Sequence, residues 1–432
     1  MNDAPHSEDS AATPPLPVAE GDSAHIKKVP VELLCPGMYV CDFNAGWLEH
    51  PFLFNRLLIS SEAEIADIRR YGITEVLIDT RRGIDLPQAP TLEEISEATT
   101  REMVDQVEAE PRPGAQPRRQ PLAEEIGRAR RVLDQTASLL QQTLNDARLG
   151  KAINVEPLRQ SAANISASVI RNASAIGLVC RLRQRDEYTF THSLNVSVLL
   201  ASFSQHLGHD QKSTEDLCLG GLLHDIGKMA VDDAVLNKPG KLTPDEFTHM
   251  KTHVDRGLAL VNNYPLPEKT MQVIAEHHER RDGTGYPHGH AWENISEAGR
   301  MAAIIDVYDA ISSDRCYHKG LPAPEAMRRI FEWQSHFDGN LVNQFVRCLG
   351  IYPVGSLVRL SSGRLAIVIE HQHNNLMRPQ VRVIYDSRHR HYLAAEDIDL
   401  AAPRWQGKEN IIRHEDPARW GIDVARHSGS QS

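Results

Sequence analysis

The chain has 432 residues, enough for two or three domains of ordinary size. Its 47 Lys and Arg residues against 58 Asp and Glu residues give a net charge of −11, which excludes a general nucleic-acid-coating protein, because such a protein needs an excess of positive charge. The six cysteines are widely spaced and form no CxxC pair, so we expect free thiols in a reducing cytosol rather than disulfides or zinc chemistry.

Residues 1–25 are rich in Pro, Ala, Ser and acidic residues, and we expect them to be disordered. They contain no basic start followed by an apolar run, so they do not predict a signal peptide. No stretch of the chain approaches the ~18 consecutive apolar residues that a membrane-spanning helix needs. We therefore expect a cytoplasmic protein without a membrane span.

Residues 26–80 are predicted to form a small α/β domain. Residues 52–59 and 73–78 are typical of strands in their apolar, β-branched composition. Between them, Ser61 with Glu64 predicts a capping box at the start of a short amphipathic helix.

A proline-punctuated linker is predicted for residues 81–121, with a short helix between Leu92 and Val107. Residues 122–175 are predicted to be connecting helices, because apolar side chains recur there at helical spacing. These side chains are Ile126, Leu133, Ala137, Leu140 and Leu144, followed by Leu158, Ala162, Ile165 and Val169. The pattern fits packed core helices and also the coiled-coil seam of a homodimer; core packing is the interpretation we favour.

Residues 176–350 are predicted to be mostly helical and to be followed by a β appendage at residues 351–400. Three short apolar runs indicate the strands of this appendage: residues 356–360, 365–370 and 381–385. The tail at residues 401–432 is expected to be polar and loose. The predicted fold class is therefore mainly α, a helical bundle with a small N-terminal α/β domain and a short C-terminal β appendage.

The helical region concentrates imidazole and carboxylate side chains. They are His192, His224, Asp225, His253, His277, His278 and Asp306. Such donors suit transition metals such as iron, manganese or zinc. Five histidines and two aspartates exceed what one ion binds, but they fit two ions that share a bridging carboxylate. Two ions about 4 Å apart can activate a water molecule and neutralise the charge that develops during phosphoryl transfer.

Each of these residues also has a purely structural interpretation. A single histidine in an apolar helix is more often a hydrogen-bonded core residue, and an adjacent pair such as His224–Asp225 also arises by chance. Asp306 alone fits an acid on a helix surface. The flanks at 222–223 and 304–305 are apolar, which weighs against these interpretations, because burying several ionisable groups without partners is costly.

Five motifs follow one another in this region. They are YTFTHS (188–193), LLHDIGK (222–228), NKPGKLTPDEFTHMKTH (237–253), HHERRDGTGYP (277–287) and DVYDAISSDRCYHK (306–319). In order and spacing they resemble the HD-GYP domain, a subgroup of the HD phosphohydrolase superfamily, over residues 170–350. Residues 26–80 and the helices after them resemble the uncharacterised domain that often precedes HD-GYP domains.

The resemblance implies an HD-type helical bundle that holds two divalent transition metals, iron or manganese. It assigns the candidate ligands to two ions: His192, His224, Asp225 and Asp306 on one metal, and His253, His277 and His278 on the other, with Asp225 bridging. Lys228 is then the catalytic partner of Asp225, contacting the scissile phosphate and stabilising the developing charge.

As the reaction, the resemblance implies hydrolysis of cyclic di-GMP to pGpG, and to GMP in some members, in bacterial second-messenger signalling. Arg315 and Lys319 match positions that contact the phosphates of the ligand. Gly285 and Tyr286 belong to the signature loop, where Tyr286 either stacks on a guanine or anchors the loop. Signalling proteins such as diguanylate cyclases are expected to dock on the same loop.

Two positions depart from the family pattern. Some members carry a Glu four residues before the first metal-binding His, where it helps to hold a third metal. Here that position is Tyr188, so we expect two metals rather than three. Cys316 and His318 stand where Pro and a basic residue are common, and this affects the expected substrate affinity more than catalysis.

Three other functions remain open from the sequence. A binding module would sense cyclic di-GMP or dock partners without turnover, another HD phosphohydrolase would act on a different nucleotide, and a scaffold would need no metal ligands. The complete ligand set and the GYP motif favour the phosphodiesterase.

Overall fold

The computed structural model describes residues 23–43, 57–70, 73–109, 120–182, 188–238, 240, 242–314, 320–371 and 375–428. They divide into two compact units, Met1–Glu102 and Met103–Ser432, and each unit is described by itself. Most of the segment expected to be disordered, residues 1–22, lies outside the described residues. So do residues 44–56, which include most of the strand predicted at 52–59.

The first unit contains a four-stranded antiparallel sheet with the order β1-β4-β2-β3. Its strands are β1 (Ile26–Pro30), β2 (Tyr39–Asp42), β3 (Leu57–Leu58) and β4 (Glu75–Asp79), and α1 (Glu62–Arg70) is its helix. Ile65 and Ile68 of α1 are fully buried in the core of this unit. The small α/β fold is therefore confirmed. The start of α1 differs from the predicted capping box of Ser61 and Glu64 in one detail. The Glu64 carboxylate accepts hydrogen bonds from the backbone N–H and the hydroxyl of Ser60.

A helix in the predicted linker is confirmed as α2 (Leu92–Ala109). Its last part, from Met103 on, belongs to the second unit. There Met103 and Val107, four residues apart and thus on one face of the helix, are fully buried in the main core.

The helices predicted after residue 121 form α3 (Leu122–Arg148) and α4 (Glu156–Leu182), which pack against each other. The apolar positions of both helices lie in one core cluster. Among them Leu133, Leu140, Leu158 and Ile165 are fully buried, so the core-packing interpretation is confirmed. Burial of each such side chain contributes about 1.5–3 kcal/mol to stability.

By length and composition, α4 is the one helix among the described residues that is apolar enough to cross a membrane. Within its most apolar window, 56% is buried inside the protein, where α4 packs against α3, α5 and α6. The apolar face of α4 is therefore a core face.

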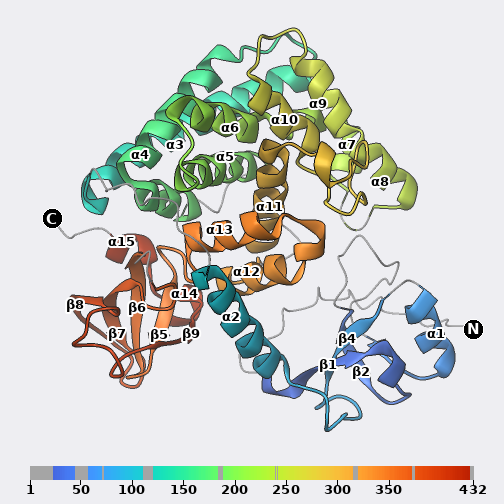
Figure 1. The fold of residues 1–432 in the computed structure, drawn as a ribbon, viewed down its shortest axis with the longest axis vertical. Helices are drawn as coiled ribbons and strands as arrows, with labels where there is room; N and C mark the ends of the chain where they lie inside the picture. The colour runs from blue at the N-terminus through green and yellow to red at the C-terminus, as the bar shows by residue number, and fades with distance from the viewer. Residues whose placement is uncertain are drawn as a thin grey trace, which may run out of the picture. The chain divides into compact units, whose positions relative to one another are not determined.

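The central bundle is built from α5 (Tyr188–His206), α6 (Gln211–Leu223), α10 (Glu268–Glu276) and α11 (Glu297–Ser312), which pack on one another (Figure 1). Residues 301–306 of α11 are buried without interruption, as expected for a helix that is surrounded by others. Five further helices complete the bundle: α7 (Asp233–Leu236), α8 (Pro244–Lys251), α9 (His253–Val261), α12 (Ala323–Glu332) and α13 (Gly339–Leu349).

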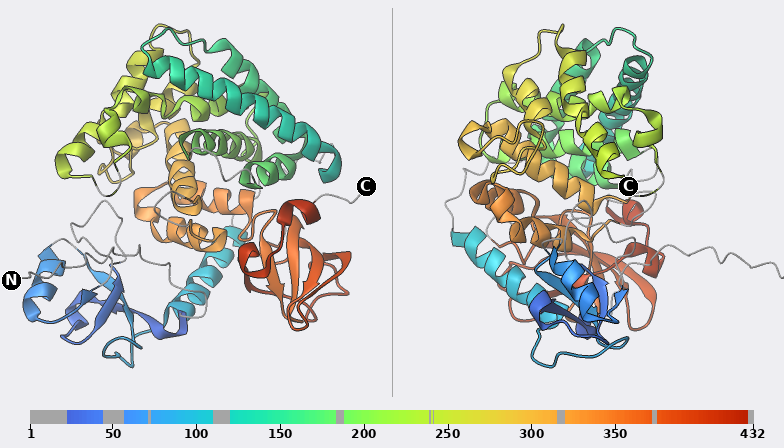
Figure 2. Two further views of the ribbon diagram at one scale, coloured as in Figure 1. Left: turned by 180° about the vertical axis from the view of Figure 1, so that it is seen from behind. Right: turned by 90° about the vertical axis from the view of Figure 1, so that its right-hand side faces the viewer.

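The C-terminal sheet is larger than predicted. Its order is β8-β7-β6-β5-β9, with all neighbours antiparallel; the sheet is drawn in orange and red in Figure 2. The strands are β5 (Leu357–Leu360), β6 (Arg364–Glu370), β7 (Gln380–Asp386), β8 (His391–Asp399) and β9 (Ile411–His414). The expectation of a loose tail after residue 400 is wrong, because β9 pairs with β5. Two short helices follow, α14 (Pro417–Trp420) and α15 (Val424–Ser428), and α15 packs on β6.

Candidate metal centre

The predicted ligands lie at the ends of helices in the central bundle. His224 follows the last residue of α6, and Asp225 precedes the short 3-10 helix η3 (Ile226–Ala230). His253 is the first residue of α9, while His277 and His278 follow α10. His192 lies in the first turns of α5, and Asp306 lies inside α11. At most 6% of each of these residues is exposed, except for the half-buried His278.

A glycine allows η3 to lie directly against α9. A Cβ atom on Gly227 would overlap the carbonyl oxygen of His253, so only glycine fits at this crossing. The close approach brings Asp225, which starts η3, next to the side chain of His253.

His192, His224 and Asp306 form the first group of ligand atoms. His192 Nε2 lies 3.0 Å from Asp306 Oδ1 and 3.3 Å from His224 Nε2. His224 Nε2 lies 3.8 Å from the same oxygen of Asp306.

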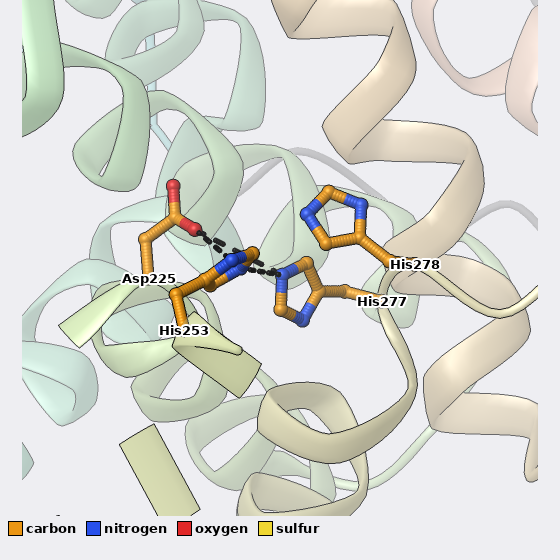
Figure 3. A group of neighbouring side chains, drawn as sticks. All are labelled: Asp225, His253, His277 and His278. Carbon is orange, nitrogen blue, oxygen red and sulfur yellow. Dashed lines mark hydrogen bonds and ion pairs between the residues drawn. The ribbon is translucent and has the colours of Figure 1, made fainter. Parts of the chain in front are cut away.

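Asp225, His253, His277 and His278 form the second group, and their ligand atoms all lie within 4.8 Å of one another (Figure 3). His253 Nε2 lies 3.4 Å from His277 Nε2 and 3.4 Å from Asp225 Oδ1. The imidazole of His278 stands beside that of His277, with 4.1 Å between the ring centroids.

The carboxylate of Asp225 joins the two groups. Its Oδ1 faces the second group, whereas its Oδ2 lies 3.2 Å from His224 Nε2 and 3.7 Å from His192 Nε2 in the first group. The carboxylate of Asp306 is also shared, because its Oδ2 lies 3.5 Å from His278 Nδ1. Two carboxylates shared between two groups of imidazoles are an arrangement that fits a binuclear metal site.

The hydrogen bonds of the imidazoles fix which nitrogen faces the site. His224 Nδ1 donates to the Gly221 carbonyl at 2.8 Å, and His253 Nδ1 donates to the Met250 carbonyl at 2.9 Å. His277 Nδ1 lies 3.0 Å from the carbonyl oxygen of Ile274. A carbonyl oxygen only accepts, so Nδ1 carries the proton in each neutral ring, and Nε2 presents a lone pair to the site.

Neutral imidazoles are the form that binds metals. Burial, helped by His224, lowers the pKa of His277 to about 3, and burial lowers the pKa of His253 to about 4 despite the nearby Asp225 carboxylate. Burial opposes ionisation of Asp225, but Lys228 and His224 outweigh it and hold the pKa of this carboxyl well below its usual value. Burial also opposes ionisation of Asp306, and His192 and His278 outweigh it in the same way.

These groups need a cation between them. Asp225 Oδ1 is buried and has no hydrogen-bond partner among the described residues, and the Nε2 atoms of His253 and His277 lie 3.4 and 3.9 Å from it. An unpaired buried carboxylate oxygen beside two acceptor nitrogens is costly. Divalent cations would pair with all of these atoms, so the residues fit a binuclear metal centre.

Lys228 lies beside the candidate bridging carboxylate. Its Nζ lies 2.6 Å from Asp225 Oδ2, and its side chain is 23% exposed. A partly exposed cation beside this carboxylate can contact both the carboxylate and an incoming anion.

Sequence reasoning missed Asp309, one turn after Asp306 on α11. Asp309 Oδ2 accepts a hydrogen bond from His192 Nδ1 at 2.7 Å, and Oδ1 accepts from Asn195 Nδ2 and from the Ser313 hydroxyl. Burial opposes protonation of His192, but Asp306 and Asp309 outweigh it and raise the pKa of this imidazole to about 9. In the sequence, the only feature that points to Asp309 is its position in the same motif as Asp306.

Two of the four predicted substrate contacts are described. Gly285 permits the loop to touch the backbone of residues 278–280, since a Cβ atom there would lie 2.6 Å from the His278 carbonyl oxygen. The ring of Tyr286 lies 4.5 Å from that of His278. Arg315 and Lys319 lie outside the described residues, as do Cys316 and His318, and nothing is described of the Tyr188 side chain.

Three family profiles match the chain. A domain of unknown function (DUF3391) matches residues 26–158, an HD domain matches residues 170–341, and a KOW domain associated with HD domain matches residues 357–404. The HD match contains all seven ligand residues.

Several curated proteins are similar to the chain. The cyclic di-GMP phosphodiesterase PA4108 of Pseudomonas aeruginosa is 39% identical over 399 residues, which cover 92% of this chain and 94% of that protein. A cyclic di-GMP phosphodiesterase of Thermotoga maritima is 36% identical over 34% of this chain and 40% of its own length. The 3'3'-cGAMP-specific phosphodiesterase 2 of Vibrio cholerae is 33% identical over 37% of this chain and 31% of its own length.

Proposed function

We propose that this chain, which belongs to the HD-GYP family of HD phosphohydrolases, is a metal-dependent phosphodiesterase that hydrolyses cyclic di-GMP. The position of the Asp225 carboxylate carries the proposal, because its two oxygens face two separate groups of imidazoles. A relative that matches nearly the whole chain is a cyclic di-GMP phosphodiesterase, which supports the same substrate here.

The residues divide between two ions. His192, His224 and Asp306 would hold one, and His253, His277 and His278 the other, with Asp225 shared. Imidazole and carboxylate donors suit iron or manganese, which we take as the ions of this site. When bound, the pair would supply an activated water at neutral pH and would neutralise charge on the phosphoryl group.

The protein residues orient the substrate and balance its charge. Lys228 Nζ lies 2.6 Å from the Asp225 carboxylate, and it would contact the scissile phosphate and stabilise the charge that develops on its oxygens. The Nδ1 hydrogen bonds of His224, His253 and His277 fix each ring, so no ring has to reorient during the reaction.

The products follow from the order of bond cleavage. Hydrolysis of one phosphodiester of cyclic di-GMP gives linear pGpG, and hydrolysis of the remaining diester gives GMP. Gly285 and Tyr286 would line the approach to the site, and Arg315 and Lys319 would supply positive charge for the phosphates. We further propose that the protein is cytoplasmic and bacterial. Diguanylate cyclases or other signalling proteins would dock on the loop 283–287, and the chain would form a homodimer.

A turnover assay tests the proposed function. Protein loaded anaerobically with ferrous iron or manganese is mixed with cyclic di-GMP or with 3'3'-cGAMP, and chromatography resolves pGpG and GMP. We expect cleavage of cyclic di-GMP with a higher kcat/KM than that of 3'3'-cGAMP. Preferred cleavage of 3'3'-cGAMP would assign another cyclic dinucleotide, and binding of cyclic di-GMP without any product would replace the enzyme with a receptor.

A further inference from the structure

Two side chains of α8 lie beside the metal ligands without being ligands. The helix begins with a capping box in which Thr243 and Glu246 exchange hydrogen bonds, and it ends at Lys251, two residues before His253. Phe247 and Lys251 are four residues apart and therefore share one face of the helix. Lys251 Nζ stands 5.2 Å from the centroid of the Phe247 ring, within the range of a cation–π contact.

The same face meets the signature loop. The Tyr286 ring contacts the Phe247 ring edge to face, with 6.3 Å between the centroids and an interplanar angle of 84°. Lys251 Nζ lies 5.9 Å from the centroid of the Tyr286 ring. All three side chains are half-buried, so they form a partly exposed aromatic and cationic surface, which we name the α8 wall.

The α8 wall adjoins the ligands directly. The Tyr286 ring lies 4.5 Å from that of His278, at an interplanar angle of 30°, and 6.2 Å from that of His253. A planar group that packs on this wall is therefore a direct neighbour of the metal-binding imidazoles.

The charge of Lys251 distinguishes it from the other lysines near the site. Lys228 is paired with Asp225, and Lys238 is paired with Glu246 at 2.6 Å. Within the described part of the chain, no carboxylate forms an ion pair with Lys251; its contacts are the two rings. A half-buried ammonium held between aromatic faces is available to an anion that arrives with an aromatic group.

We propose that the α8 wall, formed by Phe247, Lys251 and Tyr286, is the base-recognition subsite for a purine nucleotide, with one ring packing on the face and the other on the edge of one guanine and Lys251 pairing with the phosphate that is not cleaved. This inference rests on the proposed function, because it assigns a subsite to the same substrate. Every purine offers a π face to an aromatic side chain, so stacking supplies affinity, and the lysine adds a charge contact. It also gives Tyr286 a role in contacting the base rather than only in anchoring its loop.

Steady-state kinetics of wall variants test the inference. Phe247→Leu keeps the apolar volume but removes the ring, and Lys251→Gln removes the charge. We expect each to raise the KM for cyclic di-GMP roughly 10-fold, with kcat changed by less than about 3-fold, as expected for the loss of one stacking or charge contact. Lys251→Gln also weakens the salt dependence of KM, because one screened charge contact is gone.

A generic diester without a purine separates base recognition from damage to the site. For methyl p-nitrophenyl phosphate, the loss of kcat/KM in Phe247→Leu is expected to be about 10-fold smaller than for cyclic di-GMP. Phe247→Tyr, which restores a ring, is expected to recover most of the affinity that the leucine variant loses. Matched substitutions far from the site, Tyr392→Leu on β8 and Lys212→Gln on α6, serve as controls; Tyr392 is 50% exposed, and Lys212 pairs with Asp216.

The outcomes distinguish the two proposals. If the wild type cleaves cyclic di-GMP and both wall variants keep its KM within about 2-fold, or lose kcat alone, the α8 wall is not a base subsite. If the wild type cleaves no cyclic di-GMP, the proposed function is wrong. In that case, inhibition by GMP of methyl p-nitrophenyl phosphate cleavage tests the subsite. A base subsite at the α8 wall predicts an inhibition constant about 10-fold higher in Phe247→Leu than in the wild type.

Discussion

His192 Nδ1 donates a hydrogen bond of 2.7 Å to Asp309 Oδ2, whereas three other histidines of the centre donate Nδ1 to backbone carbonyls. His192 is thus a candidate ligand whose second nitrogen is held by a carboxylate outside the ligand set. A carboxylate partner orients the ring and makes its free nitrogen a stronger donor to a metal.

We predict that Asp309→Asn weakens metal binding. The substitution keeps the shape of the side chain and removes its charge, so the first group of ligands should lose affinity by about 10- to 100-fold. Metal titration in competition with a chromogenic chelator measures this directly. Asp216→Asn on α6, which removes a carboxylate that pairs with exposed Lys212, is the control. Equal affinities of Asp309→Asn and the wild type would remove Asp309 from the centre.

Gly227→Ala should separate the two halves of the centre. The added methyl group would overlap the His253 carbonyl oxygen, and the resulting shift of η3 moves Asp225 away from His253. Overpacking of this kind costs about 1–3 kcal/mol or more. Urea unfolding and metal content per chain check the result. Gly127→Ala in α3, where a Cβ atom would meet nothing within 4 Å, should leave the metal content unchanged.

Glu279 holds the loop that carries Tyr286. Its buried carboxylate accepts hydrogen bonds from the backbone N–H groups of His288 and His290 at 2.9 and 2.8 Å. Glu279→Gln replaces one accepting oxygen with a donor, which leaves one N–H unsatisfied at a cost of about 1–3 kcal/mol. Hydrogen exchange of residues 283–290 should therefore accelerate. Glu293→Gln on the exposed segment nearby is the control, and exchange equal to that of the wild type would contradict the role of Glu279.

A buried ion pair between α3 and α4 should make stability depend on pH. Glu125 is fully buried and accepts hydrogen bonds from Arg171 at 2.7 and 2.8 Å and from Ser168 at 2.8 Å. Burial opposes its ionisation, but Arg171 and Ser168 outweigh burial and lower the pKa of Glu125 below its usual value. The ionised form is thus favoured in the folded protein.

A lowered folded-state pKa means that the pair stabilises the protein above the unfolded pKa of about 4.3 and that this stability is lost as the pH falls through the folded pKa. Glu125→Gln should reduce the free energy of unfolding at pH 7 by about 1–3 kcal/mol. The difference from the wild type should shrink below pH 4. Urea unfolding at both pH values measures it, and a difference that does not change with pH would be inconsistent with an ionised Glu125.

The clustering of the candidate metal ligands could be predicted from sequence because these residues lie in motifs with recognisable spacing. His224–Asp225 and His277–His278 are adjacent in the chain, and both pairs follow the ends of helices. The partners of these ligands could not be predicted in the same way. Asp309 is an ordinary acid in a helix until the packing of α11 on α5 brings it to His192.

The last two strands of the C-terminal sheet could not be predicted from the sequence for a different reason. Most of β8 is exposed, apart from Ile398 and a few half-buried positions, so the strand lacks the apolar alternation that predicts a strand. Its Ala and Glu residues favour helices instead. Strand β9 has only four residues, and the buried Glu409 and Glu415, which pair with Arg364 and Arg359, look like surface acids in the sequence.

The most direct test of the account is a metal count combined with turnover in the same samples. Wild-type protein and Asp225→Asn are loaded anaerobically with manganese, freed of excess metal, and assayed for metal per chain and for cleavage of cyclic di-GMP. The shared carboxylate of Asp225 predicts two ions per wild-type chain, fewer than two in Asp225→Asn, and a loss of turnover of more than about 100-fold. Three ions in the wild type, or two ions with full turnover in Asp225→Asn, would contradict it.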